Sequence, residues 1–177
     1  MLFEFDKLLS KPAARAMTAQ SLAERQRDVY ESHRHRVFSL ACHMTGNEIE
    51  AESLLRDTFI SAFRRNPVPD QPIVDAALID QLRTRMDVDP VPGAPAPPPS
   101  LPIRRNILRP DLEDAIRCLP GNERLVFLLA DVEGYPAPRI AALLGMTDSA
   151  VLRAAMTARL RLRARLSAAR ADQEQAA

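Results

Sequence analysis

The chain has 177 residues, with 15 prolines, 5 glycines and no tryptophan, and its 24 basic and 23 acidic side chains leave a formal net charge of +1. This length allows one ordinary domain or two small ones. The scarcity of glycine and aromatic residues disfavours β-sandwiches, barrels and glycine-looped nucleotide folds. No stretch approaches the roughly 18 apolar residues of a membrane span, and the N-terminus lacks a signal-peptide pattern. We therefore expect an all-α protein of the cytoplasm, without a membrane span.

The N-terminal part of the chain predicts consecutive helices. Ser21 and Glu24 have the spacing of a capping box, in which each side chain satisfies a free backbone N–H at a helix start. Apolar residues then recur at helical spacing until Gly46 supplies a stop. Asn47 is placed to cap a second helix, which Pro67 would end.

A third helix fits residues 73–86, and the three helices together form a compact helical domain that we place at residues 18–88. The N-terminal extension, residues 1–17, holds an apolar cluster that either folds back onto a domain or docks a partner. Residues 89–109 are proline-rich, which predicts a stiff, polyproline-like linker. A proline-rich ligand for the aromatic groove of a partner is the alternative.

A second helical domain is expected at residues 110–170, followed by a frayed tail at residues 171–177. Pro110 suits the first turn of one helix, and Asn122 suits the cap of the next. That helix should close at Gly134. Proline residues shortly afterwards open a further short helix.

The C-terminal domain contains the spacing of a helix-turn-helix. Ala141 is a small residue that lets two helices approach, Gly145 can make the tight turn at positive φ, and Val151 can anchor the second helix on the first. Thr147 offers an N-cap to the second helix. Such a helix can lie in the major groove of DNA with its N-terminal side chains facing base edges.

The charge of the chain is unevenly distributed. Residues 139–170 hold seven arginines against one acid, a net charge of +6, whereas residues 1–138 are mildly acidic. Clustered cations neutralise phosphates, so this segment has the charge expected of a nucleic-acid interface. A solvated helical face would carry the same charge, and the charge by itself does not separate the two.

Residues 114–134 and the helix-turn-helix after them resemble region 4 of the extracytoplasmic-function (ECF) sigma factors of the sigma-70 family. The matching features are Leu119-Pro120, Arg124, Val126-Phe127, Glu133-Gly134, Ile140-Ala141 and Leu144-Gly145. The N-terminal domain resembles region 2 of the same family. Its matching features are Tyr30, Arg36-Val37-Phe38, Thr45-Gly46, Ala51-Glu52, Leu54, Phe59 and Phe63-Arg64.

The resemblance implies a two-domain transcription initiation factor that binds core RNA polymerase and promoter DNA. Region 2 would dock on the polymerase clamp and open the promoter, and region 4 would read duplex DNA. The polymerase-binding positions implied are Ser53, Arg56 and Asp57. The DNA-binding positions expected in the C-terminal domain are Arg139, Thr147, Asp148, Ser149, Arg153, Arg159 and Arg161.

The chain departs from the family pattern in region 2. No aromatic residue lies between Arg64 and Val126, and aspartates stand where cations would help to capture unpaired bases. A second hypothesis is therefore a sigma-like mimic or regulator that binds an anti-sigma factor or polymerase without melting DNA. Exposure of Leu152 and Met156 would favour this second hypothesis, whereas packing against the preceding helices would not.

No catalytic or metal-binding pattern stands out. The three histidines, His33, His35 and His43, lack ligand spacing and are expected at the surface or its boundary. Cys42 and Cys118 sit within apolar helical patterns and are expected as reduced core residues. We expect no enzymatic activity and no cofactor.

Overall fold

A computed structural model describes residues 6–88, 97 and 108–175, with side chains described for residues 21–88, 97 and 108–168. Every regular element in this part of the chain is helical, which confirms the all-α prediction. The elements are α1 (Asp6–Thr45), α2 (Glu48–Arg65), α3 (Gln71–Arg85), α4 (Arg109–Arg117), α5 (Gly121–Phe127), the π-helix η1 (Leu128–Val132), α6 (Ala137–Leu144) and α7 (Asp148–Gln175).

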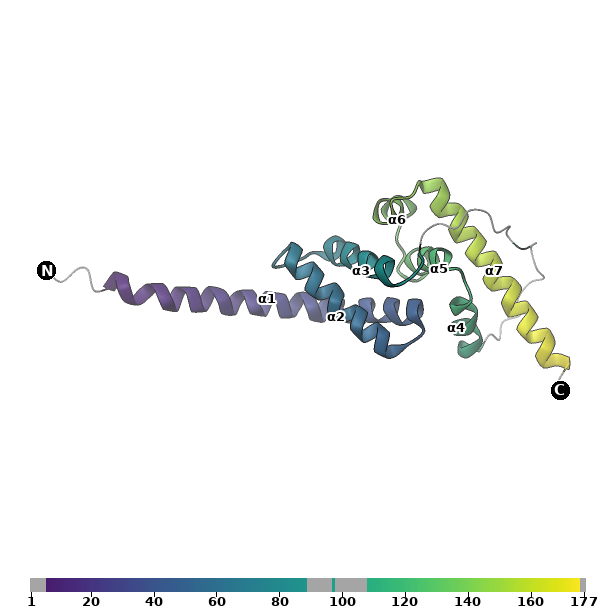
Figure 1. Cartoon of the computed structure of the whole chain (residues 1–177), viewed down its shortest axis with the longest axis horizontal. Helices are drawn as coiled ribbons and strands as arrows, with labels where there is room; N and C mark the ends of the chain where they lie inside the picture. Colours follow the sequence, from purple (N-terminus) through teal and green to yellow (C-terminus); the bar gives the residue numbers. More distant parts are fainter. Residues whose placement is uncertain (1–5, 89–96, 98–107, 176–177) are drawn as a thin grey trace.

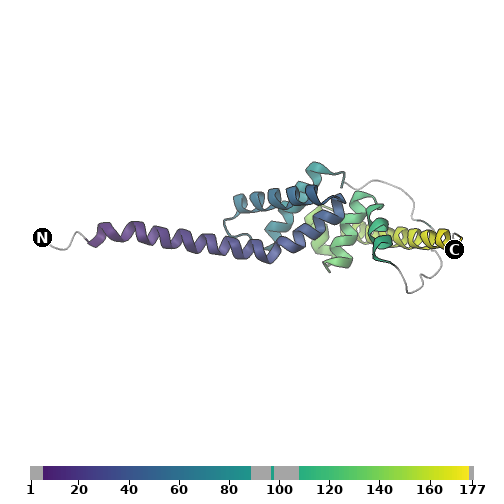
Figure 2. The same ribbon diagram turned by 90° about the horizontal axis from the view of Figure 1, so that it is seen from below.

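Helices α1, α2 and α3 pack into an N-terminal unit, from which the first half of α1 projects (Figures 1 and 2). The predicted cap of α2 is confirmed: the Asn47 side chain accepts hydrogen bonds from the backbone N–H groups of Ile49 and Glu50. Helix α3 begins after Asp70, whose carboxylate accepts from the Ile73 N–H. These caps fix where each helix turns back on the one before it.

The predicted start of the first helix is wrong, because α1 begins at Asp6 and passes through Ser21 and Glu24 without a break. Residues 13–20 are rich in strong helix formers, and extending a helix costs far less than starting a new one. A capping-box spacing therefore has no helix end to cap there. The side chains of the apolar N-terminal cluster lie outside the described residues.

Helices α4 to α7 form a C-terminal unit in which α7 packs against α4, α5 and α6. Pro110 lies in the first turn of α4, as predicted, and the chain turns at Gly134 with φ +70°. Asn122 is not a cap: α5 begins one residue earlier, at Gly121. The rigid φ of Pro120 already sets the approach to this helix.

Apolar side chains from every helix fill the interior of both units. Cys42 is half-buried, but Cys118 is exposed, so its prediction as a core residue is wrong. Cys118 stands just past the last turn of α4, where the chain leaves the apolar face of that helix. The three histidines are half-buried or exposed, as predicted. The proline-rich linker falls almost entirely outside the described residues.

Candidate nucleic-acid interface

Helices α6 and α7 make the predicted helix-turn-helix. Gly145 ends α6 in the left-handed region at φ +64°, which a residue with a Cβ rarely adopts. Ala141 and Val151 are both buried at the crossing of the two helices. The Thr147 hydroxyl accepts from the Ala150 N–H at 3.2 Å and so caps α7, as predicted.

One face of α7 is open to solvent along residues 148–163. The side chains of this face share helical spacing and are all exposed. We call it the open face; it consists of Asp148, Ser149, Leu152, Arg153, Met156, Arg159 and Arg163. The opposite face, with Val151, Ala155, Ala158 and Leu162, is buried in the C-terminal unit. The open face therefore presents both cations and apolar groups.

The predicted DNA-binding residues of α7 separate into two groups. Arg153 makes no hydrogen bond or ion pair with the part of the chain that the structure describes, and Arg159 forms an exposed ion pair with Asp131 at 2.8 Å. Arg161 lies off the open face and pairs with Glu123 of α5 at 2.9 Å. Burial raises the pKa of the Glu123 carboxyl, against the opposing effect of Arg161. Arg161 therefore stabilises the contact between α7 and α5.

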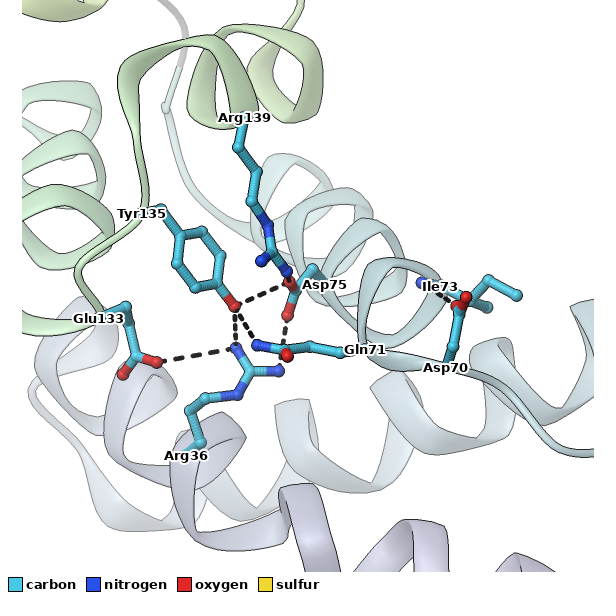
Figure 3. Close-up of polar contacts among 8 residues, drawn as sticks. All are labelled: Arg36, Asp70, Gln71, Ile73, Asp75, Glu133, Tyr135 and Arg139. Carbon is cyan, nitrogen blue, oxygen red and sulfur yellow. Dashed lines mark hydrogen bonds and ion pairs between the residues drawn. The ribbon is translucent and has the colours of Figure 1, made fainter.

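Arg139 on α6 reaches towards the N-terminal unit, and 35% of its side chain remains exposed to solvent (Figure 3). Its guanidinium donates to Asp75 Oδ2 at 2.9 Å and lies 3.9 Å from the centre of the Tyr135 ring. Asp75 is only 3% exposed, and its other oxygen accepts from Arg36 at 2.6 Å. The Tyr135 hydroxyl donates to Asp75 at 2.9 Å and accepts from Gln71 at 2.6 Å. A buried carboxylate needs such donors, because an unpaired buried charge is costly.

Two further arginines link the units through backbone carbonyls. Arg83 of α3 donates to the Leu144 carbonyl at 2.6 Å, near the end of α6. Arg124 of α5 donates to the Met44 carbonyl at 2.6 Å, near the end of α1. Burial lowers the pKa of Arg124. Both contacts place a cation on carbonyls that the last turn of a helix leaves unpaired.

The three implied polymerase-binding residues lie together on α2. Arg56 donates to the Ser53 hydroxyl and to the Asp57 carboxylate, each at 3.3 Å. Arg85 from α3 joins them, donating to Ser53 at 3.2 Å and pairing with Asp57. We call these four residues the α2 patch. Two guanidinium groups share a single carboxylate there, so the patch is cationic.

The aspartates of the third helix have structural roles. Asp70 caps α3, Asp75 holds the contact with α6, and Asp80 forms an ion pair with Arg65 of α2 at 2.5 Å. Their carboxylates thus stabilise the fold, at positions where the binding of an unpaired DNA strand would favour cations.

The sequence reasoning missed the residues that join the units. Asp75 and Tyr135 are 60 residues apart, and no local spacing relates them. A weak signal did exist for Asp75, which is an acid at an otherwise apolar position of its helix. Arg163 was also missed from the interface, although it falls on the same helical face as Met156 and Arg159.

No group of side chains suited to a metal ion occurs among the described residues. Within the described helices, none is long and apolar enough by itself to cross a membrane; α6 joined to residues 148–168 reaches that length and composition only as a pair bent by 104°.

Comparisons with known proteins agree with this architecture. Residues 109–162 match the family model described as Sigma-70, region 4. The ECF RNA polymerase sigma factor SigE of Mycolicibacterium smegmatis is 32% identical over 136 residues, which are 67% of this chain and 52% of that protein. The chain thus spans about half the length of this relative.

A solved structure also resembles this fold. The sigma factor RpoE of Bartonella quintana, crystallised in complex with the anti-sigma factor NepR, superimposes with a TM-score of 0.52. The match covers 85% of this chain and 96% of that one, at 18% identity. At this identity the likeness concerns the fold alone.

Proposed function

Since the chain belongs to the ECF group of the sigma-70 family, we propose that it is a transcription initiation factor that binds core RNA polymerase and promoter DNA. Residues 18–88 form its region 2-like domain and residues 110–170 its region 4-like domain. Such a factor acts in the cytoplasm, where polymerase and DNA meet. Sigma factors are not enzymes, which supports the expected lack of catalytic activity at the level of the family.

The observation that carries this proposal is the open face of α7. It follows a turn of helix-turn-helix geometry and begins with Asp148 and Ser149, where side chains of a reading helix meet base edges. Arg153 and Arg163 are unpaired within the described chain and free to neutralise phosphates. In this proposal the α2 patch contacts the polymerase, and an anti-sigma factor is a further candidate partner.

A second candidate function rests on the apolar side chains of the same face. Leu152 is 59% exposed and Met156 63% exposed, one turn apart. An apolar strip on a reading helix suits a protein partner better than a DNA groove. It favours the sigma-like mimic or regulator that binds an anti-sigma factor or polymerase without melting DNA.

Run-off transcription with core RNA polymerase over a genomic fragment library tests the proposal and separates it from the second candidate. An initiation factor directs transcripts from discrete start sites, and Arg153→Ala weakens them. Arg163→Ala is the matched variant on the same face and should act in the same direction. Capture of an anti-sigma protein without any recovery of polymerase, and without transcripts, would instead establish the regulator.

A further inference from the structure

We propose that the contact around Asp75 is a latch that holds the two units together and keeps the first helix of the helix-turn-helix away from DNA. This inference rests on the proposed function. Asp75 lies on α3 in the N-terminal unit, whereas two of its three donors, Tyr135 and Arg139, come from the C-terminal unit (Figure 3). The latch therefore joins the half that would bind polymerase to the half that would read DNA.

The latch engages the guanidinium of Arg139 in contacts within the chain, although 35% of the side chain stays exposed. The first helix of a helix-turn-helix crosses the DNA backbone, and a cation there positions the protein on phosphates. Here that cation is shared between a buried carboxylate at 2.9 Å and an aromatic ring at 3.9 Å. A phosphate that bound Arg139 would have to replace the Asp75 carboxylate as the partner of its guanidinium. The packing of the two units at Asp75 and the binding of a DNA phosphate by Arg139 therefore compete.

The contacts of the latch can be replaced by contacts with water. Its groups are charged or polar, and water solvates the carboxylate and the guanidinium groups once the units separate. The second contact between α3 and α6 is also polar: Arg83 donates to the Leu144 carbonyl at the end of α6. Polar contacts such as these between α3 and α6 are common between domains that move relative to one another. If only a fraction of the molecules is open, the apparent affinity for DNA falls by that fraction.

The test compares Asp75→Asn with Asp80→Asn in the full chain. Both replace a carboxylate of α3 with an amide, but Asp80 is exposed and pairs only within its own unit, with Arg65. Small-angle X-ray scattering reports separation of the units, and fluorescence anisotropy with a labelled duplex of random sequence reports DNA affinity. We expect Asp75→Asn to enlarge the radius of gyration and to bind the duplex about tenfold more tightly. Asp80→Asn should match the wild type in both measurements.

Arg83→Ala provides a second variant that leaves Asp75 and every residue of the C-terminal unit intact. It should shift both readouts in the same direction as Asp75→Asn, by a smaller factor, and it keeps the test decisive if the first variant does not fold. DNA affinity that stays the same or falls when the units separate would overturn the latch, as would no separation in either variant. If expanded variants and wild type alike leave the duplex unbound, the latch is overturned, and run-off transcription with core RNA polymerase decides the proposed function separately.

Discussion

The two helices of the helix-turn-helix share one turn but meet different surroundings. Helix α6 faces the N-terminal unit, with Arg139 on Asp75 and the Leu144 carbonyl on Arg83. Helix α7 turns its open face to solvent, with Arg153 unpaired within the described chain. The arginine-rich segment is therefore not a uniform cationic surface. Some of its charges hold the fold together, and others remain available for a ligand.

The largest expected effect is a difference in stability between a substitution on the buried face of α7 and one on its open face. Val151 is 1% exposed at the helix crossing, and its neighbour Leu152 is 59% exposed. Val151→Asp buries a carboxylate without a partner and should lower the free energy of unfolding by about 4 kcal/mol or more. Leu152→Asp should change it by less than about 0.5 kcal/mol. Urea denaturation followed by circular dichroism measures both, and equal losses would refute this assignment of faces.

The next prediction contrasts an arginine of α7 that has no ion-pair partner in the described chain with one that is paired. Arg153→Ala should weaken binding to duplex DNA several-fold and reduce the slope of log affinity against log salt by about 0.9, the contribution of one phosphate contact. Arg161→Ala should leave that slope unchanged. It should instead lower the free energy of unfolding by about 1–3 kcal/mol, because Glu123 loses its partner. A fall in salt slope for Arg161→Ala would show that the ion pair with Glu123 opens when DNA binds.

Local patterns predicted most of the helix ends but none of the contacts between the units. Asn47 and Thr147 were found because a cap acts on N–H groups two or three residues away. The arginines of α7 are close together in the sequence and are predicted as one group, but the role of each depends on the face of the helix on which it lies. The Asp75 contact draws on residues up to 64 positions apart, and tertiary packing alone brings them together. The predicted site was therefore incomplete where it depended on partners distant in the sequence.

A smaller effect is expected at Gly121, where the backbones of the two units lie in close contact. A Cβ placed on Gly121 would lie 2.2 Å from the Asp87 carbonyl oxygen, so Gly121→Ala must push α5 and residue 87 apart. We expect a loss of about 1–3 kcal/mol in the free energy of unfolding, or a larger radius of gyration. Asn122→Ala, at the next and half-exposed position, is the control. Wild-type values for Gly121→Ala would mean that the two segments do not stay in contact in solution.

The smallest expected effect concerns Glu133, which borders the Asp75 contact and has its carboxyl 3.9 Å from Arg36. Burial raises the pKa of the Glu133 carboxyl; Arg36 opposes this change and Asp75 reinforces it. The folded chain therefore keeps the Glu133 proton at pH values where the unfolded chain has already lost it. In that window, just above the ordinary pKa of glutamate, this group makes the free energy of unfolding fall as pH rises.

Glu133→Gln should remove this contribution, so that across the same window the free energy of unfolding of the variant falls less, or rises more, with increasing pH than that of the wild type. We expect a difference below about 1 kcal/mol, because Arg36 retains Asp75 as its main partner. Denaturation at a series of pH values measures it, with the exposed Glu24→Gln as the control. If the free energy of unfolding instead falls more steeply with pH in Glu133→Gln than in the wild type, Arg36 stabilises the ionised Glu133 more than burial penalises it. The carboxylate would then strengthen the contact between the units at neutral pH, and α6 would be held on the N-terminal unit by two acids instead of one.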